Sequence, residues 1–136
     1  MNLNYFILIQ TKSQPKSQTG TESALLDLIV DAIQDIKGKN IVLINLTHIP
    51  DAPARYFVIC EGDSSTQIKA IANNVARRVK EESAFRASHI EGELGAKWVL
   101  VDFFDIVVHV FDKATRQYYD LEELWSDGKM TEISNI

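Results

Sequence analysis

The segment from Trp98 to Phe111 constrains the fold of this chain more than any other. Apolar residues fill both of its halves, and the centre reads Asp102-Phe103-Phe104-Asp105. Two apolar, β-branched runs around a short interruption are typical of a β-hairpin. We therefore expect two antiparallel strands joined at Phe103-Phe104, which places three pairs of residues opposite each other: Asp102 and Asp105, Leu100 and Val107, Trp98 and His109.

The two faces of this hairpin differ in character, because successive side chains of a strand point to opposite sides. One face is wholly apolar and is the expected core face: Val99, Val101, Ile106, Val108 and Val110. The other mixes large apolar groups with an imidazole and two carboxylates: Trp98, Leu100, Asp102, Asp105, Val107, His109 and Phe111. Opposed carboxylates repel by roughly 0.2–1 kcal/mol, so we interpret this second face as a surface that meets a basic partner.

The length and composition indicate one domain. A chain of 136 residues with 46% hydrophobic content can bury a sizeable core. Its single cysteine, Cys60, cannot form an intramolecular disulfide, which fits a reducing, cytoplasmic setting, and we expect it to be a small buried hydrophobe. The apolar run Tyr5–Ile9 is too short to span a membrane, so we expect no membrane partner.

Charge is distributed unevenly along the chain. The formal net charge is −5, but residues 1–90 carry 10 Lys/Arg and 9 Asp/Glu, whereas residues 91–136 carry 4 and 10. An acidic C-terminal third disfavours contact with a nucleic-acid backbone, which requires clustered Lys and Arg. It suits a basic protein partner, although ordinary solubility charge explains the composition equally well.

Hydrophobic periodicity and capping signals predict the remaining elements. The first helix is expected at 22–37, and the second is expected to run from a capping box of Ser64 and Gln67 to about Ser83. A third helix is expected at 113–118 after the cap Asp112, and a last helical turn is opened by Asp120 and Glu123. Strands are expected at 41–46, 56–60 and 87–91, before the hairpin. We therefore predict a single α/β domain over residues 22–126 with a five-stranded mixed sheet flanked by helices, between a flexible tail at 1–21 and a frayed tail at 127–136.

Several spaced motifs together resemble one family. They are, in chain order, Tyr56-Phe57-Val58-Ile59, Gly62-x-Ser64-Ser65-x-Gln67, Glu91-Gly92, Trp98-x-Leu100-x-Asp102-x-x-Asp105-x-Val107-Val108-His109-x-Phe111, and Arg116-x-x-Tyr119-x-Leu121-Glu122-x-Leu124-Trp125. On these motifs the chain resembles the ribosomal silencing factors (RsfS, or Iojap) over about residues 25–125. It departs from the family pattern at Arg55, where Asp is usual, and at Phe104, where Gly is common.

The resemblance implies a function. Members of the family bind the large ribosomal subunit on its protein fourteen, block joining with the small subunit and so repress translation when nutrients are short. Their fold resembles that of nucleotidyltransferases without the activity, and free members are often homodimers. We therefore expect no enzyme activity, no cofactor, no metal and little or no direct contact with nucleic acid. The expected docking face consists of Trp98, Leu100, Asp102, Asp105, Val107, His109, Tyr119 and Leu121.

Two other functions remain open at this point. A nucleotidyltransferase-like, nucleotide-binding enzyme would use Asp102, Asp105 and the loop Gly62–Ser65, because paired carboxylates can share a cation and a helix N-terminus attracts phosphate. A homodimeric adaptor for some other protein is the third possibility, and the partner that co-purifies with the chain would distinguish it.

Overall fold

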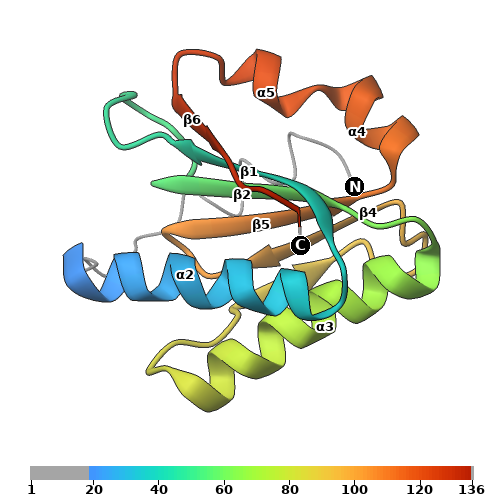
Figure 1. The fold of residues 1–136 in the computed structure, drawn as a ribbon. Coiled ribbons are helices and arrows are strands. Elements are labelled where there is room, and N and C mark those ends of the chain that lie inside the picture. The colour runs from blue at the N-terminus through green and yellow to red at the C-terminus, as the bar shows by residue number, and fades with distance from the viewer. Residues whose placement is uncertain (1–18, 136) are drawn as a thin grey trace.

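A six-stranded mixed sheet organises the part of the chain that the structure, a computed structural model, describes, residues 19–135 (Figure 1). The elements are α2 (Thr19–Asp35), β1 (Lys39–Asn45), β2 (Tyr56–Glu61), α3 (Ser65–Glu82), β3 (His89–Glu91), β4 (Trp98–Asp102), β5 (Ile106–Phe111), α4 (Lys113–Tyr119), α5 (Leu121–Leu124) and β6 (Lys129–Glu132). The strand order is β3-β4-β5-β2-β1-β6, in which β2 and β5 are parallel and all other neighbours antiparallel. The predicted mixed α/β domain is confirmed, with six strands in place of five.

The additional strand comes from the C-terminal segment that we expected to fray. Residues 129–132 form β6 at the edge of the sheet, beside β1, and the Ile133 N–H donates to the Ile41 carbonyl at 2.9 Å. All four strand residues are exposed, so they carry no hydrophobic pattern from which the strand could be predicted. We predicted an N-terminal tail at 1–21. Residues 1–18 of it lie outside the described part of the chain, and residues 19–21 belong to α2.

Capping explains where the longer helices begin. The Ser64 hydroxyl accepts from the Gln67 N–H at 3.1 Å, as predicted for the start of α3, and the Gln67 amide donates to the Ile36 carbonyl at 3.0 Å, which joins α3 to the end of α2. Asp112 caps α4 as predicted, accepting from the Thr115 N–H at 2.7 Å. The predicted second capping box is wrong: Asp120 has a left-handed φ of 46° and makes no side-chain cap bond.

Helices cover both faces of the sheet. Helices α2 and α3 lie against one face, and α4 and α5 lie on the other side (Figure 1). The first face buries the predicted core residues of the hairpin with residues of α2 and α3, including Ile29, Ile33, Ile68, Ile71 and Val75. The second face buries another cluster, including Phe57, Ile59, Trp98, Leu100, Val107, Phe111 and Leu121. The central strands are therefore apolar on both sides because both sides are covered. No helix in the described part of the chain has the length and apolar content needed to cross a membrane.

The hairpin forms as predicted but in a shifted register. The pairs are Leu100 with His109, Asp102 with Val107 and Trp98 with Phe111, so the turn is centred on Phe104-Asp105 rather than on Phe103-Phe104. A shift of two residues in the partner strand keeps every side chain on its predicted face. The Asp102 carboxylate accepts from the Phe104 N–H at 2.7 Å, and Phe104 has a φ of 69°, the left-handed conformation that glycine adopts most easily.

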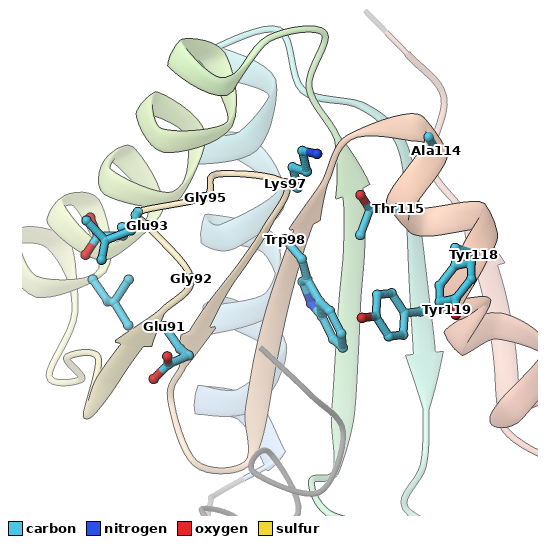
Figure 2. Close-up of a pocket in the computed structure, with 12 residues that line it drawn as sticks. Glu91, Gly92, Glu93, Gly95, Lys97, Trp98, Ala114, Thr115, Tyr118 and Tyr119 are labelled. Carbon is cyan, nitrogen blue, oxygen red and sulfur yellow. The ribbon is translucent and has the colours of Figure 1, made fainter.

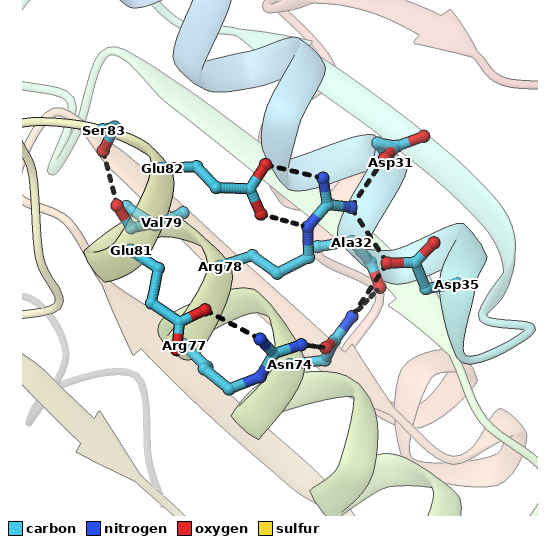
Figure 3. Close-up of polar contacts among 10 residues, drawn as sticks. All are labelled: Asp31, Ala32, Asp35, Asn74, Arg77, Arg78, Val79, Glu81, Glu82 and Ser83. Carbon is cyan, nitrogen blue, oxygen red and sulfur yellow. Dashed lines mark hydrogen bonds and ion pairs between the residues drawn. The ribbon is translucent and has the colours of Figure 1, made fainter.

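A polar network joins the exposed sides of α2 and α3 (Figure 3). Arg78 donates to three carboxylates: those of Asp31 at 2.6 Å, Asp35 at 2.9 Å and Glu82 at 2.6 Å. Its side chain is 16% exposed, whereas that of the neighbouring Arg77 is 56% exposed and pairs with only one carboxylate, Glu81. The fixed fork of the Arg78 guanidinium therefore bridges the two helices, beside a buried contact in which the Asn74 amide donates to the Ala32 carbonyl at 2.9 Å.

We predict that Arg78→Lys lowers the stability of the domain more than Arg77→Lys does. A lysine keeps the charge at position 78 but cannot reach three carboxylates in one geometry. Urea unfolding monitored by circular dichroism should show a lower midpoint for the Arg78 variant than for the Arg77 control. Equal midpoints would mean that the network contributes no more than an ordinary surface pair.

Burial also governs Cys60, which lies in β2 with no exposed surface. Loss of solvation raises the pKa of the Cys60 thiol to about 12. We predict that the folded chain does not react with an aromatic disulfide reagent at pH 8, and that one thiol reacts when denaturant is added. Rapid reaction without denaturant would show that β2 opens in the folded state.

Candidate partner-docking groove

The mixed hairpin face, which we expected to be open, is covered in the folded chain. Six of the eight expected docking residues are at most 5% exposed: Trp98, Leu100, Asp102, Val107, His109 and Leu121. The expectation of an open surface is therefore wrong, because α5 and the loop before β2 contribute Leu121, Trp125, Ile49 and Ala52 to the same apolar cluster. That these residues bind a ribosomal protein stays a prediction, and direct contact now depends on those that reach the surface.

The two carboxylates of the hairpin do not form a pair. The shifted register places Asp102 opposite Val107, and Asp105 lies in the turn, where its carbonyl accepts from the Arg55 N–H at 2.8 Å. The Arg55 guanidinium donates to Glu22 at 2.6 Å, and this bond, with smaller contributions from the charges of Glu22 and Asp105, raises the pKa of Arg55. The expected repulsion between the two hairpin carboxylates is therefore no argument for a basic partner at this position.

The groups that the nucleotide-binding alternative requires do not lie together. Asp105 precedes β5, whereas Gly62 follows β2, and these two strands run parallel in register from Tyr56 and Ile106 to Glu61 and Phe111. The carboxylates and the loop Gly62–Ser65 therefore lie at opposite ends of the sheet, about 20 Å apart for six residues of strand. Among the described residues, no three His, Cys, Asp or Glu side chains gather into a group that could hold a metal.

A groove remains accessible at the end of the hairpin where β4 begins (Figure 2). It encloses about 830 Å³ between the loop 90–98 and one side of α4. We call it the α4 groove and define it by its lining residues: Ile90, Glu91, Gly92, Glu93, Leu94, Gly95, Lys97, Trp98, Ala114, Thr115, Tyr118 and Tyr119. Two of the eight predicted docking residues, Trp98 and Tyr119, line it.

An aromatic stack fixes the floor of the α4 groove. The Trp98 ring lies 4.7 Å from that of Tyr119 and 5.0 Å from that of Phe111, between centroids. The Trp98 indole N–H donates to Nδ1 of His109 at 3.0 Å, which holds the imidazole in the tautomer with its proton on Nε2. Burial lowers the pKa of His109 to about 3, so the imidazole stays neutral and remains an acceptor at ordinary pH. Trp98 is therefore a rigid support rather than a free anchor.

The rim of the groove exposes apolar side chains. Leu94 is fully exposed, Tyr118 is 82% exposed and Tyr119 is 40% exposed. Several large exposed apolar side chains around one hollow favour an interaction site. Two carboxylates accompany them: Glu93 is exposed, and Glu91 accepts from Nε2 of His89 at 2.8 Å. The combination suits a partner with an apolar contact and basic side chains around it.

The loop that carries Leu94 has a defined backbone. Gly92 has a φ of 93°, and the Ala96 N–H donates to the Gly92 carbonyl at 3.0 Å, which closes a tight turn. A side chain at Gly92 would be strained at that φ. The turn lifts Leu94 away from the core. The neighbouring Gly95 is also open, because apart from its two chain neighbours no atom lies within 4 Å of the position that a Cβ would take there.

A buried arginine anchors the other wall of the groove. Arg116 in α4 is 7% exposed and donates to the Asn40 carbonyl at 2.7 Å and to the Glu61 carboxylate at 3.2 Å. It also donates to Glu122 in α5 at 3.2 Å, so one guanidinium ties α4 to β1, β2 and α5. Both walls are thereby held in place before any partner arrives.

The sequence patterns did not single out the exposed rim of this groove, formed by Glu93, Leu94 and Tyr118. The available signal was Leu94, a large apolar residue placed between Glu93 and Gly95 in a turn where nothing can bury it.

Comparison with known proteins shows the family. The family described as "Ribosomal silencing factor during starvation" matches residues 17–136. The chain belongs to this family. It is 40% identical over 112 residues to the ribosomal silencing factor RsfS of Halalkalibacterium halodurans, covering 82% of this chain and 94% of the relative. It is 36% identical to RsfS of Bacillus subtilis, covering 82% and 93%. A crystal structure of a protein from Chromobacterium violaceum superposes with a TM-score of 0.73 at 35% identity, covering 83% of this chain and 92% of the other.

The family match covers the whole described fold but not the first sixteen residues of the chain. The family match begins at residue 17, two residues before α2 starts. The α4 groove, its aromatic floor and the Arg116 anchor therefore all lie within the matched region, whereas the apolar run Tyr5–Ile9 lies outside it.

We predict that His109 makes the stability of this domain depend on pH. Its folded pKa of about 3 lies below the ordinary value of 6.5, so the unfolded chain binds the proton first as the pH falls. The free energy of unfolding should therefore fall from pH 6.5 downward, by about 2 kcal/mol at pH 5 from this group alone. Urea unfolding at pH 7 and pH 5 measures it, with His109→Gln as a control that keeps an acceptor for Trp98. Equal losses in both proteins would contradict the assignment.

Proposed function

We propose that the chain silences ribosomes by binding protein fourteen of the large subunit through the α4 groove. The bound chain stands between the subunits, blocks their joining and lowers translation in the cytoplasm when nutrients are limiting. The observation that carries the proposal is the exposed apolar rim of the groove, in a chain that belongs to the ribosomal silencing factors. The mechanism is steric, so it requires no catalytic residue.

Physical features of the groove support a protein ligand. Aromatic and apolar side chains around a rigid centre are the composition of binding hot spots, and Tyr118, Leu94 and Trp98 supply it here. Glu91 and Glu93 flank this centre and suit the Lys and Arg side chains of a ribosomal protein, mainly by guiding approach and orientation. Because both walls are already anchored, binding loses little conformational entropy.

The buried residues of the predicted docking face keep an indirect part in this proposal. His109 and Phe111 hold Trp98 at the floor of the groove, and Leu121 packs in the same cluster. Substituting them would change binding through the shape of the floor. Asp105 lies at the other end of the sheet and is not part of the proposed contact.

Sedimentation of purified ribosomal subunits through a sucrose gradient tests the proposed function. At a magnesium concentration that permits joining, the chain should migrate with the large subunit and the joined particle should disappear. Migration at the top of the gradient, with subunits joining freely, would contradict silencing by this chain. Migration with the small subunit would contradict the proposed partner.

We predict that Leu94→Asp weakens binding to the large subunit at least tenfold, or about 1.4 kcal/mol. Leu94 is fully exposed in the free chain, so the change should leave folding intact while placing a charge in the apolar rim. Leu124→Asp is the matched control, because Leu124 is 52% exposed and lies outside the groove. Equal affinities of the two variants, measured by sedimentation of labelled chain with large subunits, would rule out the groove as the docking surface.

A further inference from the structure

The N-terminal segment has an unusual composition for residues outside a family match. Tyr5-Phe6-Ile7-Leu8-Ile9 is an unbroken apolar run, and residues 1–18 contain two lysines, Lys12 and Lys16, with no Asp or Glu. The α4 groove that such a segment could meet is lined by two carboxylates, Glu91 and Glu93, and one ammonium group, Lys97. An apolar run followed by lysines complements an apolar groove with two carboxylates beside it.

We propose that Tyr5–Ile9 binds in cis in the α4 groove and competes there with the ribosomal partner. The docking of the segment stands on the groove itself, whereas the competition rests on the proposed function. The segment supplies the apolar contact, and the lysines that follow it lie near the carboxylates of Glu91 and Glu93. The chain would thereby lower its own affinity for the ribosome.

The connecting residues are long enough for this contact. α2 begins at Thr19, and its first turn is tied through Glu22 and Arg55 to the end of the sheet where β5 starts. The groove lies at the other end of β5, about 20 Å away for six residues of strand. The chain from Tyr5 to Gln18 can extend up to about 45 Å, which covers this span and the passage around the edge of the sheet.

The α4 groove suits the segment better than the other apolar hollow of the domain. That hollow lies between α2 and the end of α3, encloses about 340 Å³ and is lined by Leu25, Leu28 and Phe85. It is less than half the volume of the α4 groove, and Glu82 at its edge is already bonded to Arg78. The α4 groove has room for aromatic side chains and offers aromatic partners, Trp98 and Tyr119.

Tethering makes even a weak contact effective. A short linker that can span the distance between a segment and its site gives an effective concentration on the order of 1 mM. A segment with a dissociation constant of about 0.1 mM would then occupy the groove about nine-tenths of the time and weaken partner binding roughly tenfold.

Hydrogen exchange of the full-length chain tests the docking without a ribosome. The variant Phe6→Asp/Leu8→Asp should exchange several-fold faster than the unmodified chain in residues 91–98 and 114–119. Ser13→Asn/Ser17→Asn is the linker control, since it changes two linker residues without altering the charge beside Lys12 and Lys16, and it should leave these residues protected. Unchanged exchange in the groove, or a change confined to residues 21–28 and 82–85, would overturn the proposal.

Binding to purified large subunits tests the competition. The Phe6→Asp/Leu8→Asp chain should bind roughly tenfold more tightly than the unmodified chain and the linker control. Faster exchange in the groove with unchanged affinity would overturn the competition. If none of the three chains binds large subunits, the proposed function fails, while the exchange result still decides whether the segment occupies the groove.

Discussion

The central strands of this domain are apolar on both faces, so both faces must be covered, and the rest of the structure depends on this requirement. Phe57 and Ile59 point to one side of β2, and Val58 and Cys60 to the other, and all four are fully buried. Helices α2 and α3 cover one side (Figure 1). The short helices α4 and α5, with the loop before β2, contribute to the cover of the other, and Arg116 fastens that layer to the sheet.

This requirement decides where a partner can bind. A sheet face that is already buried offers no surface, so the apolar groups of the α4 groove lie at its margin, where the loop after β3 meets α4. Trp98 links the two regions: its ring belongs to the second core and also forms the floor of the α4 groove. The hydrogen bond to a neutral His109 keeps that ring in place without exposing an unpaired N–H. In the proposed docking, stability and binding are therefore coupled at one residue, and the exposed rim of Leu94 and Tyr118 allows them to be separated.

Sequence patterns predicted most of the fold, because its signals are local. The caps at Ser64 and Asp112 and the face alternation of the hairpin depend on neighbouring residues and are all observed. The hairpin register was predicted wrongly because the observed turn requires a left-handed φ at Phe104, a conformation that a phenylalanine seldom adopts. Strand β6 is held by backbone pairing and has no apolar pattern. Of the predicted docking residues, only Trp98 and Tyr119 line the α4 groove. The others are covered by tertiary contacts, among them those of Leu121 and Trp125, which the sequence pattern of the hairpin does not contain.

The most direct test of the account is a cryo-EM reconstruction of the chain bound to the large ribosomal subunit. The account predicts that ribosomal protein fourteen covers the loop 91–97 and the exposed side of α4, with Leu94 and Tyr118 buried in the contact and the strands of the hairpin still paired as in the free chain. A complex in which the subunit contacts β6 or the outer faces of α2 and α3, and leaves the α4 groove open to solvent, would contradict it.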